Sequence, residues 1–223
     1  KVTYFKGKGV LFSKNDIVVY ENSNKRVNIK SKNIVIATGS TASSLPSIEI
    51  NEKNIVSSTG ALSFDKVPTN LAVIGGGYIG LEMGSVWSRL GSNVTVIEYL
   101  DFITPGMDRE ISNEFQKILS KQGIKFKMES KVESIEDKGN SVKISYTNVK
   151  NSKKEVLEVE KVLVSVGRKP YTEGLNLSKI GIKKDNKGRI EVNNKLQTSV
   201  SNIYAIGDVI KGPMLAHKAE EEG

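Results

Sequence analysis

The sequence predicts an α/β fold: an open parallel sheet that has an antiparallel β-meander as its last crossover. Between residues 71 and 126, short apolar runs alternate with segments of helical periodicity in the order βαβαβ, which places successive strands in one parallel sheet. Short runs of alternating polarity follow between residues 132 and 159, and an apolar run at residues 161–166 returns to the sheet. The contents of 38% hydrophobic and 26% charged residues are those of an ordinary globular protein.

Residues 1–40 have the alternating polarity of strands. They end in an apolar run at residues 33–37 that is followed by Thr38 and Gly39, and this pattern predicts a buried strand that stops at a tight turn. Residues 41–69 lack a strong period and contain Pro46 and Pro68. We expect a connection there, with one short helix near residues 58–64.

Two helices are predicted between the central strands at residues 71–74, 94–97 and 124–126. The first follows a turn of glycines, ends before Gly91, and has an apolar stripe made of Ile79, Met83, Val86, Trp87 and Leu90. The second spans residues 108–122 and stops at Gly123, and its expected inward face consists of Ile111, Phe115, Ile118 and Leu119.

The C-terminal part of the chain is looser from Tyr171 onward. It finishes in an apolar run at residues 201–206 that stops at Gly207 and Asp208. This repeats the pattern at Thr38 and Gly39, so we expect both flanks of the chain to belong to a sheet other than the central one.

Composition excludes several classes of function. The net charge of +8 comes from lysines that are spread from Lys1 to Lys218 rather than clustered with aromatic residues, so we predict no nucleic-acid binding. No apolar run approaches the ~20 residues of a membrane-spanning helix. Because the chain has no cysteine and one histidine, we expect no disulfide, no thiolate nucleophile and no metal site. We also expect the chain, which starts at Lys1 without a Met, to be a piece of a longer protein.

A glycine fingerprint follows the first central strand. Residues 75–80 fit the pattern GxGxxG, and they open a helix. Gly75 would make the tight turn, Gly77 would let the backbone approach a pyrophosphate, and Gly80 would allow close packing of the helix on the strand. The helix N-terminus would offer unpaired N–H groups to the phosphates. The alternative, a merely glycine-rich turn, leaves this context unexplained, so we predict dinucleotide binding.

Glu98 stands at the end of the next strand and decides which dinucleotide is favoured. A carboxylate there can accept hydrogen bonds from the two hydroxyls of the adenosine ribose, whereas it would repel a 2′-phosphate. NADP sites usually offer an Arg nearby, but residues 99–101 are Tyr, Leu and Asp. We therefore predict NAD; the alternative is that Glu98 is a solvated strand end.

Three other side chains have two interpretations each. Glu82 is expected at the edge of the apolar stripe rather than in open solvent, where it would either stabilise the first turn of the helix or lie near the nicotinamide. Trp87 is expected in the core rather than on a cofactor. His217, on generic grounds, is expected to be a solvated residue at a helix start rather than a catalyst.

Six segments of the chain carry a family resemblance. Residues 36–40, 57–62, 73–87, 166–170, 203–208 and 212–223 closely resemble, in order, segments of the dihydrolipoamide dehydrogenases, also called dihydrolipoyl dehydrogenases. The fingerprint and the Gly207–Asp208 strand end are shared by the wider family of pyridine nucleotide-disulfide oxidoreductases. Residues 57–62 and 214–217 point more narrowly to the dihydrolipoamide dehydrogenases.

The resemblance implies a flavoprotein that oxidises the dihydrolipoyl groups of 2-oxo acid dehydrogenase complexes. In that family electrons pass from the dithiol to an enzyme disulfide, then to FAD, and finally as hydride to NAD. The implied fold is Rossmann-like, of the FAD/NAD(P)-binding type. Residues 41–170 would form the NAD-binding domain, residues 1–40 the C-terminal part of the FAD-binding domain, and residues 171–223 a partial central domain that completes the FAD site.

The resemblance also assigns cofactor contacts. The residues implied to contact NAD are Gly75, Gly76, Gly77, Tyr78, Ile79, Gly80, Leu81, Glu82, Glu98, Val132 and Gly167. Those implied to contact FAD are Gly9, Thr38, Gly39, Ser40 and Asp208, with Met214, Leu215, Ala216 and His217 along the flavin. These assignments favour the nicotinamide role for Glu82 and reverse the generic interpretation of His217.

The chain also departs from the family. The family's redox-active cysteine pair and first FAD fingerprint would precede Lys1, and its catalytic His with a partner Glu would follow Gly223. We therefore assign no catalytic residue and no metal ligand, expect no turnover of dihydrolipoamide by the chain alone, and expect it to be the larger, internal part of the whole protein.

The resemblance implies partners and leaves rival functions open. The partners would be lipoyl domains and other subunits of a 2-oxo acid dehydrogenase complex, and the intact protein would be a homodimer, without nucleic acid or membrane. The rivals are a related disulfide reductase, a mercuric reductase, a soluble transhydrogenase and a non-catalytic NAD-binding module. The bias toward Lys and Asn favours a bacterial cytoplasm, with the mitochondrial matrix as the alternative.

Overall fold

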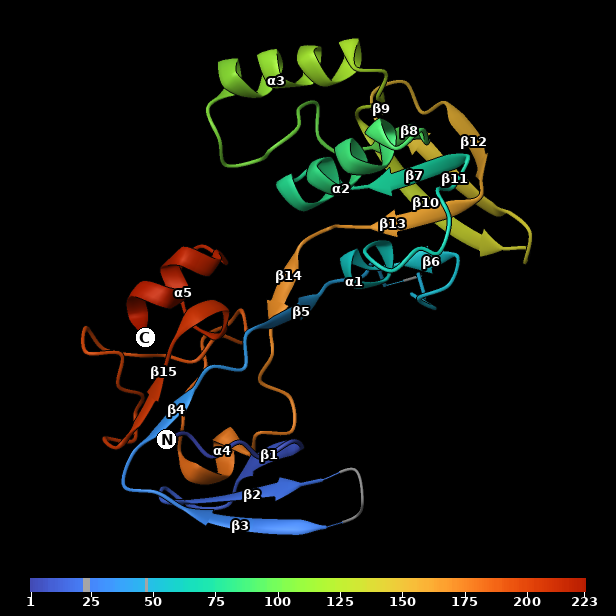
Figure 1. Ribbon diagram of the computed structural model, residues 1–223. Coiled ribbons are helices and arrows are strands. Elements are labelled where there is room, and N and C mark those ends of the chain that lie inside the picture. Colours follow the sequence, from blue (N-terminus) through green and yellow to red (C-terminus); the bar gives the residue numbers. More distant parts are fainter. Residues whose placement is uncertain (22–24, 47) are drawn as a thin grey trace. The chain divides into compact units, whose positions relative to one another are not determined.

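The computed structural model describes residues 1–21, 25–46 and 48–223 and divides into two compact units (Figure 1). The central unit comprises residues 42–167, and the flanking unit comprises residues 1–41 together with residues 168–223. The chain therefore enters the central unit from the flanking unit and returns to it. Among the described residues, no helix has both the length and the apolar character that crossing a membrane requires.

A five-stranded parallel sheet forms the middle of the central unit. Its order is β6-β13-β7-β8-β9, and every recorded pairing in it is parallel. The strands are β6 (Ile55–Val56), β7 (Asn70–Ile74), β8 (Asn93–Ile97), β9 (Lys125–Lys127) and β13 (Lys161–Val164). The predicted βαβαβ order with a returning last strand is confirmed.

Two layers cover the sheet. One face, with Leu71 and Val73, packs against α2 (Tyr78–Arg89) and α3 (Arg109–Lys121), where Leu81 and Leu119 are buried. The other face packs against an antiparallel meander of β10 (Ser130–Asp137), β11 (Val142–Asn148) and β12 (Lys154–Val159). The predicted meander crossover is therefore confirmed. A one-turn helix, α1 (Ser58–Ala61), lies in the connection where a short helix was expected.

The helix ends follow from their capping residues. The Asp108 carboxylate accepts hydrogen bonds from the N–H groups of Glu110 and Ile111, so it satisfies two unpaired donors at the start of α3. Gly91 and Gly123 have φ of +113° and +99°, directly after the ends of α2 and α3. These positive φ values are the reason why a glycine stops each helix.

The predicted inward face of α3 is confirmed for Leu119 and wrong for Ile111, Phe115 and Ile118. Ile111 and Ile118 are 57% and 50% exposed and Phe115 is exposed as well, whereas Ser112 and Leu119 are buried. The helix thus meets the sheet along a line about one residue, or about 100°, away from its most apolar line. The buried Ser112 hydroxyl is hydrogen-bonded to the Thr104 hydroxyl at 2.8 Å, which fixes this rotation at the start of the helix. On α2, Val86 and Leu90 are likewise exposed, whereas Trp87 is in the core 5.1 Å from the ring of Phe64.

The flanking unit contains several small sheets. An antiparallel sheet is formed by β1 (Lys8–Leu11), β2 (Asp16–Tyr20) and β3 (Arg26–Lys30). A parallel pair is formed by β4 (Ile34–Ile36) and β15 (Ile203–Ala205), so the expectation that the two flanks share a sheet apart from the central one is confirmed. A short pair is formed by β5 (Ser40–Ala42) and β14 (Arg168–Pro170). The helices are α4 (Leu177–Ile180), a 3₁₀ turn η1 (Gly207–Val209) and α5 (Ala216–Glu222). Val35 in β4 is 56% exposed, so this strand is buried on one face only.

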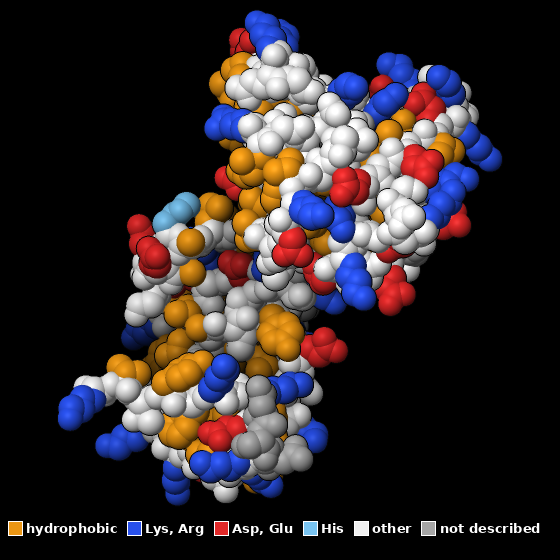
Figure 2. Space-filling model, turned by 45° about the vertical axis from the view of Figure 1, so that its right-hand side comes forward, with side chains coloured by type: hydrophobic (Ala, Val, Ile, Leu, Met, Phe, Trp, Pro, Cys, Tyr) orange, Lys and Arg blue, Asp and Glu red, His pale blue; other side chains and the backbone are white. Residues whose placement is uncertain are grey.

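Charged side chains are distributed over the surface. On the face drawn in Figure 2, Lys and Arg side chains are interspersed with Asp and Glu and do not form a single basic patch. This is the distribution that the spacing of lysines along the chain predicts.

Candidate functional site

The carboxyl ends of β7, β8 and β13 lie side by side in the central unit. The N–H of Gly75, after β7, donates to the carbonyl of Ile97 at 2.9 Å, and the N–H of Ser165, after β13, donates to the carbonyl of Ile74 at 2.9 Å. The chain leaves β7 through α2 toward β8, while β13 pairs with the opposite edge of β7. Ligands of open α/β sheets bind at such a switch point, beyond the carboxyl ends of the strands.

The three fingerprint glycines occupy different surroundings. Gly75 has φ of +104°, and a Cβ on it would lie 2.6 Å from the carbonyl oxygen of Ser165. A Cβ on Gly80 would collide with the carbonyl of Gly75 and would lie 2.5 Å from the hydroxyl of Ser165. In contrast, a Cβ on Gly77 would have no described atom within 4 Å. As the sequence predicts, Gly75 makes the tight turn, Gly80 allows the close packing, and Gly77 leaves the approach to the backbone open.

The start of α2 is open to an anion. Gly77 is its N-cap, and within the described residues no side chain caps the helix there. The N–H groups of the first turn lack intrahelical acceptors, so they present donors and a partial positive charge to the open space at Gly77. This cradle fits a pyrophosphate.

Glu98 is buried, so its interpretation as a solvated strand end is wrong. Its side chain is 8% exposed; Oε2 accepts the N–H of Gly76 at 2.5 Å, and Oε1 accepts the N–H of Leu100 at 2.8 Å. Each carboxylate oxygen has two acceptor positions. Glu98 therefore orients the fingerprint turn and keeps the capacity to accept hydrogen bonds from a diol.

The loop between β8 and α3 was not singled out from the sequence, yet it completes this turn. The N–H of Thr104 donates to the carbonyl of Gly76 at 2.7 Å, and a Cβ on Gly76 would lie 3.2 Å from Cγ2 of Ile103. Ile103 is fully buried and Thr104 is 5% exposed. The sequence signal for this role is weak, because neither residue belongs to a motif.

The other residues predicted to contact NAD fall into three groups. Gly167 follows Ser165 at the same sheet edge, and Val132 lies half-buried in β10, close in sequence to Ser130, whose N–H donates to the carbonyl of Glu98 at 2.8 Å. Leu81 is buried in the core. Tyr78 and Glu82 are exposed and Ile79 is half-buried. The expectation that Glu82 avoids open solvent is therefore wrong, because Glu82 lies on the outer side of α2.

In the flanking unit, two residues distant in sequence, Arg168 and Asp208, converge on Ser40. The Ser40 hydroxyl donates to the Asp208 carboxylate. The Arg168 guanidinium donates from Nε to the Ser40 hydroxyl at 2.6 Å and from Nη2 to the Ser40 carbonyl at 2.7 Å. Asp208 is thus oriented by a hydroxyl that is itself fixed by an arginine. Arg168 received no role from the sequence.

A second set of contacts fixes the backbone just before Asp208. The Gly207 N–H donates to Oε2 of Glu222 at 2.7 Å, and Nζ of Lys218 donates to the Gly207 carbonyl at 3.1 Å. The Lys218–Glu222 pair has its own contact of 2.8 Å, and both side chains are less than one-fifth exposed. Side chains of helix α5 therefore bind both the N–H and the carbonyl of Gly207.

The remaining residues predicted to contact FAD are placed as follows. The Thr38 hydroxyl donates to the carbonyl of Tyr171 at 2.6 Å, and Gly39 has φ of +70° with no described atom within 4 Å of a Cβ built on it. Met214 and Leu215 are half-buried just before α5, and Ala216 and His217 are exposed in its first turn. Gly9 in β1 pairs with Val19 in β2, and among the described residues no hydrogen bond connects Gly9 to Ser40, Arg168 or Asp208.

A comparison with protein families identifies the family of this chain. The model of the family described as pyridine nucleotide-disulphide oxidoreductase matches residues 1–223. The chain belongs to this family. Family membership accounts for the parallel sheet, the fingerprint and the two strand ends in one chain.

Curated members of the family are similar to the chain over its whole length. It is 53% identical over 223 residues to a leghemoglobin reductase of Glycine max and 53% identical over 223 residues to a mitochondrial dihydrolipoyl dehydrogenase of Pisum sativum. It is 54% identical over 222 residues to a dihydrolipoamide dehydrogenase of Chaetomium thermophilum. These alignments cover 99–100% of the chain and 43–44% of the relatives. The chain thus spans less than half of their length, so the expectation that it forms the larger part of such a protein is wrong.

Solved structures of the family have the same fold. The HOCl-induced flavoprotein disulfide reductase RclA from Escherichia coli matches with a TM-score of 0.86 at 29% identity, covering 97% of this chain and 48% of that chain. Its Cu(II) complex matches with a TM-score of 0.87 at the same identity and coverage. The predicted FAD/NAD(P)-binding fold is confirmed by this similarity.

Proposed function

We propose that the chain is the NAD-binding part, with portions of the FAD site, of a dihydrolipoyl dehydrogenase. The whole protein would oxidise protein-bound dihydrolipoamide to lipoamide and reduce NAD⁺ to NADH, releasing one proton. The observation that supports the NAD assignment best is Glu98, which lies buried beside the open start of α2 and accepts the N–H of Gly76. The identity of about half of the residues to dihydrolipoyl dehydrogenases supports the reaction.

The division of the chain into two compact units supports the proposed domains. Residues 41–170 would bind NAD, and the central unit spans residues 42–167. Residues 1–40 and 171–223 would contribute to the FAD site, and the flanking unit unites residues 1–41 with residues 168–223. Gly39, Ser40 and Asp208 would hold the flavin, because an open glycine turn and an oriented carboxylate suit a ribityl chain.

The residues of the chain would bind and orient cofactors rather than react. The N–H groups at the start of α2 would bind the pyrophosphate, and Glu98 would accept hydrogen bonds from the adenosine ribose. Bound FAD and NAD would supply the hydride chemistry. Since the chain contains no cysteine, we propose that it does not turn over dihydrolipoamide by itself.

The relatives also bear on partners and location. Several carry the word mitochondrial in their names, which supports the mitochondrial setting over the bacterial cytoplasm. We propose lipoyl domains and other subunits of a 2-oxo acid dehydrogenase complex as partners, and a homodimer for the whole protein. The leghemoglobin reductase of Glycine max is as similar to the chain as the enzyme of Pisum sativum, so a haem protein is the second candidate for the electron acceptor.

Calorimetric titration of the full chain with NADH and with NADPH tests the NAD assignment. We expect a clear preference for NADH, and we expect Glu98→Gln to weaken NADH binding by about ten- to a hundredfold, because a charged acceptor of the ribose hydroxyls is lost. Glu133→Gln is the matched control, since Glu133 is an exposed carboxylate paired with Lys131 on β10. A folded chain that binds NADH no better than NADPH would contradict the proposal.

The identity of the electron acceptor is tested with the whole protein. Dihydrolipoamide-dependent reduction of NAD⁺ and NADH-dependent reduction of a ferric haem protein are measured in parallel. Rapid turnover in the first assay and none in the second would support the proposed reaction, and the reverse would favour the second candidate.

A further inference from the structure

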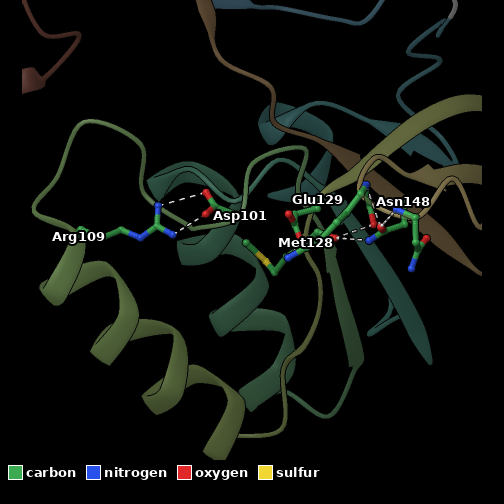
Figure 3. Close-up of polar contacts among 8 residues, drawn as sticks. Asp101, Arg109, Met128, Glu129 and Asn148 are labelled. Carbon is green, nitrogen blue, oxygen red and sulfur yellow. Dashed lines mark hydrogen bonds and ion pairs between the residues drawn. The ribbon is translucent and has the colours of Figure 1, made fainter.

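An arginine of α3 is paired with Asp101, three residues after Glu98, although none is present in residues 99–101. Arg109, the first residue of α3, donates from Nη1 to Oδ1 of Asp101 at 3.1 Å and from Nη2 to Oδ2 at 2.7 Å. Figure 3 shows this two-pronged contact next to the segment that contains Met128 and Glu129. The guanidinium also lies 4.3 Å from the centre of the Phe102 ring. Arg109 is therefore held in a fixed orientation by its neighbours in the β8–α3 loop.

Backbone contacts connect this ion pair to Glu98. Oε1 of Glu98 accepts the N–H of Leu100, and the carbonyl of Leu100 accepts the N–H of Glu129 at 2.9 Å. Asp101 follows directly after Leu100. The backbone next to the residue that binds Arg109 is therefore fixed by Glu98. A second cation, Lys150, lies 4.0 Å from Oε2 of Glu129. Arg109 and Lys150 are thus each matched by a carboxylate.

The charges around Asp101 all act in one direction. The hydrogen bond from Arg109 and the positive charges of Arg109 and Lys150 lower the pKa of Asp101, so the carboxylate stays ionised at neutral pH. Both side chains of the Asp101–Arg109 pair are about half exposed. Exposed pairs of this kind contribute little to folding stability. Folding stability therefore does not account for the pair.

A guanidinium with a free fork is the group that proteins use for the 2′-phosphate of NADP, because it can donate two parallel hydrogen bonds to phosphate oxygens. We propose that Asp101 is a specificity-determining residue: by occupying both prongs of Arg109, it withholds this guanidinium from a 2′-phosphate and thereby reinforces the preference for NAD. The inference rests on the proposed NAD site. Glu98 excludes the 2′-phosphate directly, whereas Asp101 removes the cation that would attract it.

The test is calorimetric titration of the full chain carrying Asp101→Asn, with NADPH and NADH at low ionic strength. We expect NADPH to bind about tenfold more tightly than to the parent chain, from the loss of one negative charge and the release of Arg109 near the 2′-phosphate. NADH binding should change by less than about twofold, because NADH has no group for Arg109. The gain for NADPH should shrink as salt is added.

Three further variants isolate the cause. Arg109→Gln alone should not strengthen NADPH binding, because it leaves Asp101 as an unpaired negative charge. Arg109→Gln added to Asp101→Asn should abolish the gain, because the net charge of the pair is then the same as in the parent chain. Glu114→Gln is the matched control: Glu114 is an exposed carboxylate of α3 paired with Lys117 at 2.6 Å, and its removal changes the net charge equally. We expect no gain for NADPH in this control.

The outcomes separate this inference from the proposed function. A parent chain that binds NADH, together with an Asp101→Asn chain that gains nothing for NADPH, would overturn the inference and leave the NAD site intact. A gain that persists in the double variant or appears in Glu114→Gln would also overturn it, since Arg109 would then have no part. A parent chain that does not bind NADH would contradict the NAD site itself and with it the inference. Loss of NADH binding in Asp101→Asn would show that Asp101 contacts NAD directly, which is likewise contrary to the inference.

Discussion

Two buried glycines of α2 allow the packing of the fingerprint helix to be tested with a matched pair of substitutions. Gly80→Ala places a methyl group against the carbonyl of Gly75, 2.5 Å from the hydroxyl of Ser165 and 2.9 Å from Cγ1 of Val73. Gly84→Ala, one turn later, places the same group 3.4 Å from Cγ1 of Val94 in ordinary contact. The substitution, the helix and the degree of burial are the same, and only the space differs.

The expected effects have opposite signs. Alanine is favoured over glycine inside a helix by about 1 kcal/mol. At Gly84 the added methyl group fits, so the free energy of unfolding should rise by about 0.5–1 kcal/mol. At Gly80 overpacking costs about 1–3 kcal/mol and the clash with the backbone carbonyl of Gly75 puts the cost at the upper end, so a net loss of about 1–2 kcal/mol is expected. The two variants should therefore differ by about 1.5–3 kcal/mol.

Urea unfolding followed by tryptophan fluorescence measures this difference. Trp87 is the single tryptophan, is 9% exposed, and belongs to the core between α2 and the sheet, so it reports on the central unit. The midpoints should move apart while the slopes stay equal. Equal destabilisation by both substitutions would refute the argument, because it would mean that glycine is needed in α2 for a reason other than the contact with Gly75 and Ser165. A stabilising Gly80→Ala would refute it as well.

Substitutions at three other residues test separate parts of the structure. Hydrogen bonds from Lys127, Tyr146 and Lys153 lower the pKa of Glu155 to about 2, below the unfolded value of about 4.3. The stability that this carboxylate contributes is therefore present above about pH 4.3 and lost as the pH falls toward 2. The free energy of unfolding of Glu155→Gln should be lower than that of the parent chain at pH 7, and the difference should fade over that range. Ile118→Thr should change the unfolding free energy by less than about 0.5 kcal/mol, because Ile118 is 50% exposed; a loss above about 2 kcal/mol would show that the side chain is buried. Arg168→Gln should lower the flavin content of the purified whole protein and shift the absorption spectrum of the remaining flavin. Arg168→Lys should restore neither fully, because one ammonium group cannot replace the two donors of the guanidinium. Unchanged flavin content with an unchanged spectrum in both variants would exclude Arg168 from positioning Asp208.

Local periodicity and turn chemistry were sufficient to predict the central sheet and its crossovers. An apolar strand, a glycine turn and a helix that ends at Gly91 are each determined by residues within a few positions of one another. The same applies to the separate tasks of Gly75, Gly77 and Gly80, because each depends on the strand–turn–helix unit in which it lies. Predictions of this kind need no knowledge of the tertiary structure.

The orientation of α3 could not be predicted in this way. Its apolar residues indicate one inward face, yet the helix is turned toward Ser112 and Leu119. The cause lies in the preceding loop: the Asp108 cap and the Ser112–Thr104 hydrogen bond fix the first turn. Periodicity describes the helix as if it were free to rotate, and these contacts remove that freedom.

The contacts among Ser40, Arg168 and Asp208 could not be predicted from the sequence either. Arg168 is 128 positions from Ser40, and Ser40 is 168 positions from Asp208. Nothing local marks the three as neighbours, because their meeting depends on the pairing of β5 with β14 and on the place of η1 after β15. Only the resemblance to a family singled out Ser40 and Asp208, and it gave no role to Arg168.

The two candidate carboxylates, Glu98 and Asp208, are organised by the same physical requirement. Each follows a parallel strand, where a polar group leaves the hydrogen-bonding pattern of the sheet and needs new partners if it is not to be solvated. Glu98 obtains them from backbone N–H groups of Gly76 and Leu100, and Asp208 from the hydroxyl of Ser40. In both places at least one partner, Gly76 or Ser40, comes from another segment and orients the carboxylate. A strand end followed by an acidic residue therefore predicts where a ligand hydroxyl could bind, whereas the direction of its lone pairs follows only from the surrounding fold.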